Sequence, residues 1–213
     1  MARHPVDTAT LQDELDAFYE RSGFGDVPGT RPRTVRVYTG CLLVPMPNIE
    51  ARRRFLKYHD LHHLVTGFSI GRIGEGEVSA WELGSGSAFV SPTLGVMNLI
   101  ALSTGLVLNR KRMWRAFRLG CNSRNLYSAA MRTDVDRGRW PDVAALRQTL
   151  LGSRKSTLPL PLRAVEFFLY AVLAMFIHAA IAIPALITRF VTDILLGQSF
   201  IEAVKPKKRA DLY

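Results

Sequence analysis

The chain has 213 residues, of which 28 are Lys or Arg and 18 are Asp or Glu, so its formal net charge is +10. It is also 48% hydrophobic, with a mean hydropathy of +0.08, and this apolar content excludes disorder as a description of the whole chain. The two cysteines, Cys41 and Cys121, lie in separate segments, which excludes a disulfide framework. A membrane surface is the partner that explains both the basic charge and the apolar excess.

The N-terminal third predicts one helix and one extended segment. Residues 1–7 contain no apolar run of signal-peptide length, so we expect the protein not to be secreted. Apolar residues at helical spacing predict a helix over 10–21. Residues 35–44 favour a strand or a buried apolar stretch, which Pro45 and Pro47 are expected to end.

The next predicted element is a helix over 48–66, with Asn48 as its cap and Gly67 as its stop. A glycine-rich loop is expected to follow, carrying Glu75 and Glu77. Either carboxylate could reach back to the end of the preceding helix.

Residues 83–109 carry no charge, and their uninterrupted part predicts a buried helix from about 94 to 108. Its small residues would let a lipid or another helix approach closely, so the segment is either a wall of a lipid groove or an ordinary core helix. A basic helix over 110–133 and a short helix over 141–151 are expected next. The basic helix suits either anionic lipid or a solvated surface.

The composition changes at Gly152, which divides the chain into a domain over 1–151 and a C-terminal part over 152–213. Residues 167–188 are uncharged and almost wholly apolar, which is the length that spans a bilayer. The segment is a membrane span, an interfacial helix or a buried helix of the core, and membrane insertion is the favoured interpretation. Its small-residue face suits a membrane hairpin, a homodimer or packing against 94–108, and comprises Ala171, Ala174, His178, Ala182 and Ala185.

The residues with the clearest chemistry are His59, Asp60, His62 and His63. On a helix, His59 and His63 share a face, and Asp60 lies at its edge. Two imidazoles and a carboxylate from one helical turn make half of a metal site, which a carboxylate of the following loop, Glu75 or Glu77, could complete. His62 points to one side, either as a further ligand or as a residue that supports the ligands or contacts substrate. Solvent-exposed histidines without a metal are the plainer alternative.

A family resemblance follows from these residues. The pattern His59-Asp60-x-x-His63, then eleven residues, then Glu75 resembles the signature of the ubiquinone-biosynthesis Coq-four family. Pro-rich residues 43–48 and the segment 76–84 are also similar to it, and the likeness covers roughly 10–151.

The resemblance implies an all-α protein, a single helical domain with a lipid-binding groove, to which this chain adds a hydrophobic C-terminal helix. It implies that His59, Asp60, His63 and Glu75 hold a divalent metal, zinc or iron, and form the catalytic site. The expected ligand is a prenylated hydroxybenzoate, and the expected reaction is its oxidative decarboxylation at ring carbon 1. The expected location is a membrane, at its cytoplasmic face or at the matrix face of the mitochondrial inner membrane, beside other quinone-biosynthesis proteins.

Three alternatives stay open at this level. The same ligands could hold a structural metal in a non-catalytic, lipid-binding scaffold, or the fold could serve another lipid or secondary-metabolite pathway. An HD-type phosphohydrolase would need a further His and Asp, for which His4, Asp134 and Asp136 are the weak candidates. Nucleic acid is not an expected partner, because the charges follow no recognised nucleic-acid-binding motif.

Overall fold

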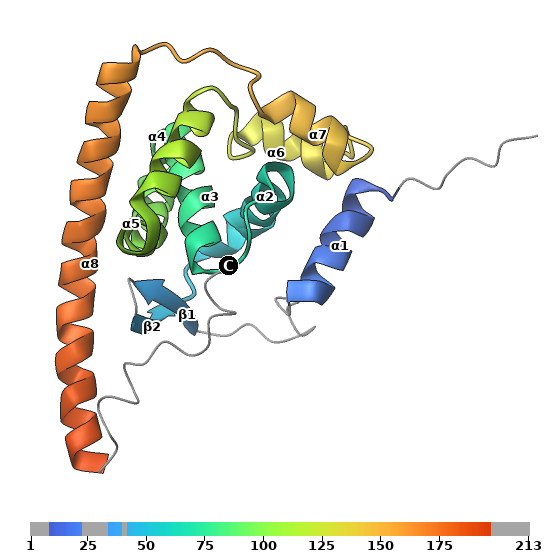
Figure 1. Cartoon of the computed structure of the whole chain (residues 1–213). Helices are drawn as coiled ribbons and strands as arrows, with labels where there is room; N and C mark the ends of the chain where they lie inside the picture. Colours follow the sequence, from blue (N-terminus) through green and yellow to red (C-terminus); the bar gives the residue numbers. More distant parts are fainter. Residues whose placement is uncertain (1–8, 23–33, 40–41, 197–213) are drawn as a thin grey trace, which may run out of the picture.

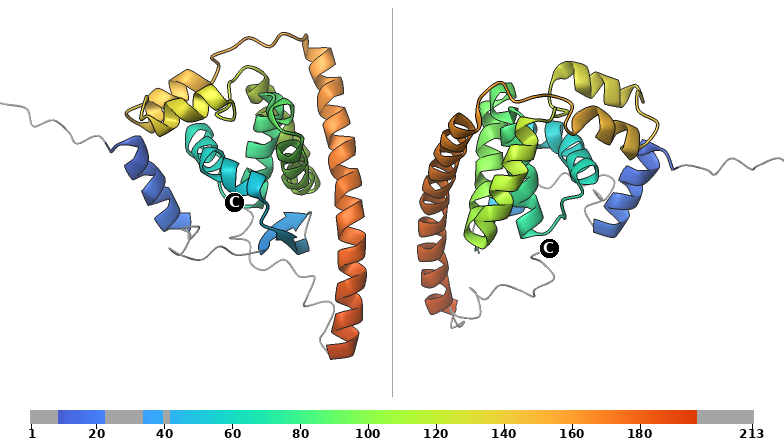
Figure 2. Two further views of the ribbon diagram at one scale, coloured as in Figure 1. Left: turned by 180° about the vertical axis from the view of Figure 1, so that it is seen from behind. Right: turned by 45° about the horizontal axis from the view of Figure 1, so that its top comes forward.

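The computed structural model describes residues 9–22, 34–39 and 42–196. These residues form eight helices and one short β-hairpin, and the all-α prediction is confirmed. Figure 1 shows helices α2 to α7 gathered in a bundle, with α1 at one side and the long α8 along the other. The same arrangement is seen from behind and from above in Figure 2.

The first helix, α1 (Leu11–Ser22), confirms the helix predicted over 10–21. Thr10 caps it, because its Oγ1 accepts a hydrogen bond from the backbone N–H of Asp13 at 3.2 Å. The Asp13 carboxylate accepts in return from the N–H of Thr10 at 2.9 Å. Leu15 and Phe18 are buried, so the apolar stripe of α1 faces the bundle.

The extended segment is a hairpin of β1 (Thr34–Thr39) and β2 (Leu42–Pro47), which pair antiparallel. The prediction that Pro45 and Pro47 end the segment is wrong, because both belong to β2. Each strand of a two-stranded sheet has one neighbour, so a proline can stand where its missing N–H would face away from the partner. Pro45 pairs with Arg36 across the hairpin.

Helix α2 (Glu50–Thr66) confirms the helix predicted over 48–66, although Ile49 and not Asn48 occupies the N-cap. Gly67 ends α2 in the left-handed conformation, with φ of 74°, and its N–H donates to the carbonyl of His63. This stop sets the direction in which the chain returns toward the histidines.

The glycine-rich loop prediction is wrong from Arg72 onward, because Arg72–Gly84 form helix α3. Glycine disfavours a helix by itself, and close packing overrides this preference here. A methyl group on Gly76 would lie 2.7 Å from the Cα of Gly105, so two backbones meet at this point. Glu75 consequently stands in the first turn of a buried helix.

After the single turn α4 (Ser87–Val90), helix α5 (Pro92–Cys121) breaks at Asn109, whose φ and ψ are −159° and 80°. A methyl group on Gly105 would lie 2.2 Å from the Sδ of Met113. In a straight helix these residues would be about 12 Å apart, so the chain turns back at Asn109. Both halves of α5 pack on α3, which confirms a buried helix over 94–108.

The predicted basic helix over 110–133 is wrong in its second half, because α5 ends at Cys121 and α6 (Ala129–Asp136) begins separately. Ser128 caps α6 by accepting a hydrogen bond from the N–H of Met131. Helix α7 (Val143–Leu150), capped by Asp142, confirms the helix predicted over 141–151. Leu126, Val135, Leu146 and Leu150 join α1 and α2 in one hydrophobic core.

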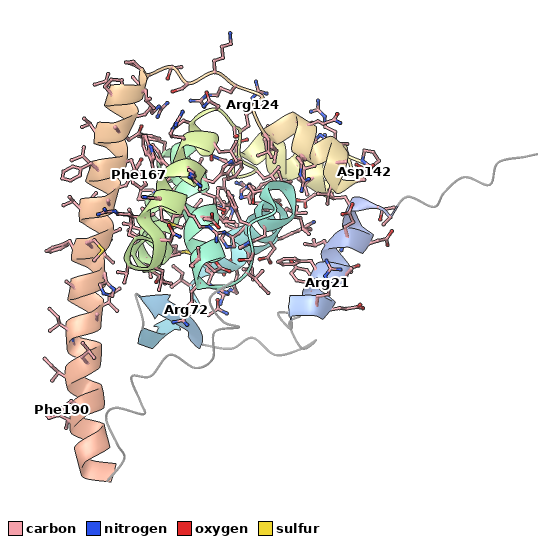
Figure 3. The ribbon with its side chains drawn as sticks, in the orientation of Figure 1. Arg21, Arg72, Arg124, Asp142, Phe167 and Phe190 are labelled. Atoms are coloured by element: carbon pink, nitrogen blue, oxygen red, sulfur yellow. The ribbon has the colours of Figure 1, made fainter. Side chains whose placement is uncertain are left out.

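Helix α8 (Leu160–Leu196) confirms a helix over 167–188 and continues past Pro184. The ring of Phe167, which is labelled in Figure 3, lies 5.3 Å from the ring of Trp114 and 5.1 Å from that of Phe117, both on α5. Ala174 is fully buried in the core that α3 and α5 form, so the small-residue face of α8 points toward the bundle. The division of the chain at 151 stays a prediction.

Two helices are long and apolar enough to cross a membrane, by length and composition alone. They are Pro92–Cys121, with a mean hydropathy of 1.3 and half of its apolar window buried, and Leu160–Pro184, with a mean hydropathy of 2.1 and 11% buried. Because α5 turns back at Asn109 and packs on α3, its apolar character is that of a core helix. Most of the apolar window of α8 is exposed.

Candidate metal centre

Three of the predicted ligands come together where α2 meets the first turn of α3. His59 and His63 lie one turn apart on α2, with ring centroids separated by 4.9 Å. Glu75 faces both rings from α3, and one ligand atom of each residue lies within 4.8 Å of the others. The structure therefore contains a His₂Glu group that could hold a metal ion.

The carboxylate of Glu75 bridges the two imidazoles. Its Oε2 lies 3.3 Å from Nε2 of His59, and its Oε1 lies 3.4 Å from Nε2 of His63. The side chain of His63 is 1% exposed, that of His59 is 20% exposed and that of Glu75 is 34% exposed. The group is thus closed behind His63 and open to solvent beside Glu75.

The second carboxylate of this segment, Glu77, does not reach the group. It faces the opposite way and accepts two hydrogen bonds from the guanidinium of Arg112, at 2.7 and 2.6 Å. This bidentate pair ties α3 to the second half of α5. Of the two carboxylates considered for the site, Glu75 alone is placed to serve.

Hydrogen bonds hold both imidazoles with Nε2 facing Glu75. Nδ1 of His63 lies 3.0 Å from the carbonyl oxygen of Phe68, and Nδ1 of His59 lies 2.9 Å from Oε1 of Glu82. Nδ1 donates in both cases, because each partner is an acceptor. Nε2 of His63 is buried and has no hydrogen-bond partner in the described part of the chain. An orphaned buried nitrogen aimed at a carboxylate is what a metal ligand requires.

Glu82 is the residue of this centre that sequence reasoning missed. It is fully buried, and its Oε1 accepts from His59, from Nδ1 of His62 at 2.7 Å and from the hydroxyl of Tyr127 at 2.5 Å. Glu82 follows Glu75 by seven residues, which is two helical turns and hence the same face of α3. That spacing could have identified it had the segment been read as a helix.

His62 supports the ligands and does not join them. Its Nδ1 donates to Glu82, and its Nε2 accepts from the backbone N–H of Leu126 at 3.0 Å. Both ring nitrogens are therefore occupied, and the ring is fully buried against Trp81. Of the three roles that the sequence left open, namely ligand, supporting residue and substrate contact, the structure favours the supporting one.

Asp60 is the predicted ligand that the structure does not bring into the His₂Glu group. Its carboxylate is buried on the neighbouring face of α2 and receives a hydrogen bond from the side chain of Tyr19. Burial raises the pKa of Asp60, against the opposing effect of His59 and His63. Coordination by Asp60 stays a prediction.

The charges of the centre compensate one another. Burial disfavours a charged imidazole, but the carboxylates of Glu82 and Glu75 outweigh it and hold the pKa of His59 well above its ordinary value. Burial likewise opposes the charge of both carboxylates, yet the histidines hold the pKa of Glu75 and that of Glu82 far below the ordinary range. In the absence of a metal, a proton on His59 takes the place of the cation between two carboxylates.

The donor set fits a divalent metal. Two imidazole nitrogens and one carboxylate, with one side open, match both the three-ligand pattern of catalytic zinc sites and the two-His-one-carboxylate set of non-haem iron. The ligands alone do not separate zinc from iron.

Comparisons with models of known protein families, with curated proteins and with solved structures give no match to this chain. The likeness to the Coq-four family therefore rests on the signature residues themselves. The HD-type alternative gains nothing: Asp134 pairs with Arg139, Asp136 pairs with Lys57, and His4 lies outside the described residues.

Proposed function

We propose that the protein is a metal-dependent enzyme that acts on a prenylated hydroxybenzoate, in the manner that the resemblance to the Coq-four family implies. The observation that carries the proposal is the His₂Glu group, closed behind His63 and open beside Glu75. A structural metal is usually enclosed by four protein ligands, whereas a catalytic one keeps a position for substrate. The open side therefore supports catalysis over a scaffold role.

A divalent metal held by His59, His63 and Glu75 would supply a Lewis acid for the carboxylate or phenol oxygens of the substrate. The protein's own contribution is to orient the ligands. Glu82 and the carbonyl of Phe68 hold the two imidazoles by their Nδ1 atoms. The buried contacts of His62 and Tyr127 in turn keep Glu82 in place.

The proposed reaction replaces the carboxylate at ring carbon 1 by a hydroxyl group. The carbon–carbon bond to the carboxylate breaks and carbon dioxide leaves, while a new ring carbon–oxygen bond forms. One atom of dioxygen enters the ring and the other becomes water, so the balance from the ionised carboxylate requires two electrons and three protons, of which an added donor supplies both electrons and two protons and the solvent supplies the third proton. The assay described below supplies both dioxygen and a reductant.

The outward face of α8 supports a location at a membrane. It exposes a continuous set of large apolar side chains: Leu160, Leu162, Val165, Phe168, Leu169, Val172, Leu173, Met175, Phe176, Ile183, Ile187, Phe190 and Val191. Exposed basic residues stand on the neighbouring half of α5, at Arg110, Lys111, Arg115 and Arg118. An apolar face beside cations suits the surface of an anionic bilayer, where a prenylated substrate resides. The cytoplasmic or matrix side and the quinone-biosynthesis partners belong to this proposal.

The test is an assay of the purified, metal-loaded protein with a prenylated hydroxybenzoate, dioxygen and a reductant. We expect carbon dioxide release matched by ring hydroxylation, with both lost in the His63→Ala variant. Zinc-loaded and iron-loaded protein are compared in parallel. Metal binding and lipid binding without turnover for either metal would reject the enzyme and favour the scaffold. Absence of metal binding would reject the site itself.

A further inference from the structure

A cavity of about 500 Å³ lies at the N-terminal end of α2, apart from the His₂Glu group. Its walls come from the start of α2, from the junction of α4 and α5, and from the segment that leads into α6. The lining residues are Glu50, Arg54, Phe55, Val90, Ser91, Tyr127, Ala129 and Arg132. The volume is in the range of small-ligand sites, which are about 300–1,000 Å³.

Two cations that line this cavity, Arg54 and Arg132, form no ion pair within 4 Å in the described part of the chain, although Arg132 lies near enough to Asp136 to lower its pKa. The neighbouring carboxylates bind elsewhere: Glu50 pairs with Arg53 at 2.6 Å, and Asp136 pairs with Lys57 at 3.0 Å. Two arginines and one glutamate therefore line the cavity, and because that glutamate is paired with Arg53, the lining carries a net positive charge. Arginine binds carboxylate and phosphate groups through paired hydrogen bonds, so the cavity is suited to an anion.

The same cavity has apolar walls. The ring of Phe55 lies 5.7 Å from the guanidinium carbon of Arg54 and 5.3 Å from that of Arg132. Val90 adds an aliphatic surface that is 43% exposed, and the adjacent Phe89 is 84% exposed. A small, fully hydrated anion would leave these apolar groups in contact with water. An anion that carries an apolar body would cover them.

We propose that this cavity is a second ligand site, which binds an amphiphile with one carboxylate or phosphate group. Arg54 and Arg132 bind the anionic group, and Phe55, Val90 and Ala129 contact the apolar part. The site goes beyond the proposed function and needs no metal. Tyr127 separates the two centres, because its ring forms a wall of the cavity and its hydroxyl binds Glu82 behind His59.

The test is titration of the full-length protein with decanoate below its critical micelle concentration, followed by isothermal calorimetry. We expect saturable binding that Arg54→Gln weakens by about tenfold or more, as loss of a charge-assisted hydrogen bond implies. Arg52→Gln is the matched control, because Arg52 lies on the same turn of α2, does not line the cavity, and bonds to Asn48 and not to Glu50. Arg132→Gln should weaken binding as Arg54→Gln does. Arg132 also donates a hydrogen bond to the carbonyl of Tyr127, so its replacement could prevent folding. In that event Arg54→Gln alone decides the test.

Three comparisons make the outcome decisive. Acetate and decyl maltoside, which carry only the anion and only the apolar chain, should bind much more weakly than decanoate. Equal binding of either one, or equal decanoate affinity in the Arg52→Gln and Arg54→Gln variants, overturns the proposal. The His63→Ala variant should keep full decanoate binding. That result separates failure of this site from failure of the metal centre.

Discussion

Oε1 of Glu82 lies 2.9 Å from Nδ1 of His59, and this contact joins a fully buried carboxylate to the ligand at the open side of the centre. The same oxygen binds His62 and Tyr127, so one atom connects α2, α3 and the segment before α6. A carboxylate behind a histidine ligand fixes its ring and increases its basicity. Glu82 is thus the positioning residue on which the geometry of His59 depends.

The first prediction concerns this carboxylate. Glu82→Gln keeps the shape of the side chain but removes its charge, so we expect metal affinity to fall by about 10–100-fold. Competition with a chromophoric chelator measures the change. Glu77→Gln is the matched control, because Glu77 is a buried carboxylate on the same helix that pairs with Arg112 and not with a ligand. Equal losses in both variants would show that general destabilisation, and not positioning, is responsible.

The second prediction separates two adjacent histidines. His63→Ala should abolish stoichiometric metal binding, because it removes the buried, unpartnered Nε2. His62→Ala should keep the metal and lose stability, by roughly 2–4 kcal/mol, because it removes one of the three hydrogen bonds to Glu82 and leaves the N–H of Leu126 unsatisfied. Elemental analysis and urea unfolding measure the two effects. A full metal content in His63→Ala would refute the site.

The metal ligands were accessible from the sequence because they depend on local spacing. His59 and His63 share a face in any helix, and the stop at Gly67 turns the chain back toward them. The prediction of Glu75 as a ligand depended on the family resemblance, and the structure places it between the rings. The two histidines therefore needed only one helix to be identified, whereas Glu75 needed the resemblance.

Other features were not accessible because they depend on tertiary contacts. Helix α3 forms in spite of its glycines since Gly76 and Gly84 let the two halves of α5 approach its backbone. Without α3, the face that carries both Glu75 and Glu82 could not be recognised. The reversal at Asn109 likewise divides one apolar and basic run into two antiparallel helices, a geometry that periodicity does not report.

The third prediction concerns pH. Glu82 and Glu75 raise the pKa of His59 against the effect of its burial, so the metal-free centre keeps a proton to higher pH than a free imidazole does, and a metal must displace that proton. Metal affinity should therefore fall by about tenfold per pH unit as the pH decreases below the raised pKa of His59. Stability of the apoprotein should change in the opposite sense. The contribution of protonated His59 is complete below its unfolded pKa and is lost as the pH rises through its folded pKa.

Calorimetry in buffers with different ionisation enthalpies measures the number of protons released on metal binding. One proton near neutral pH is expected, and none is expected well above the pKa of His59. A metal affinity that does not change with pH would contradict this assignment of the proton.

The fourth prediction tests the close approach of α3 and α5. A methyl group on Gly120 would lie 2.1 Å from the carbonyl oxygen of Trp81, so Gly120→Ala must push two backbones apart. We expect a loss of about 1–3 kcal/mol in the free energy of unfolding, as overpacking in a core typically costs. Urea denaturation measures it, with Leu119→Ala at the exposed neighbouring position as the control. Equal effects of the two variants would argue against this packing.

The fifth prediction concerns the outward face of α8. Phe168 and Phe176 are large apolar side chains of α8, yet they are 64% and 71% exposed. Replacing both by Asp puts two charges where lipid is proposed to lie, which should reduce co-sedimentation with anionic vesicles by about tenfold or more. The bundle should keep its stability, because neither ring is buried.

Phe89→Asp is the matched control, since Phe89 is 84% exposed on α4. If the double variant bound vesicles as the unmodified protein does, α8 would not be the membrane contact. If the double variant kept vesicle binding but lost self-association, the partner of this face would be a second copy of the chain.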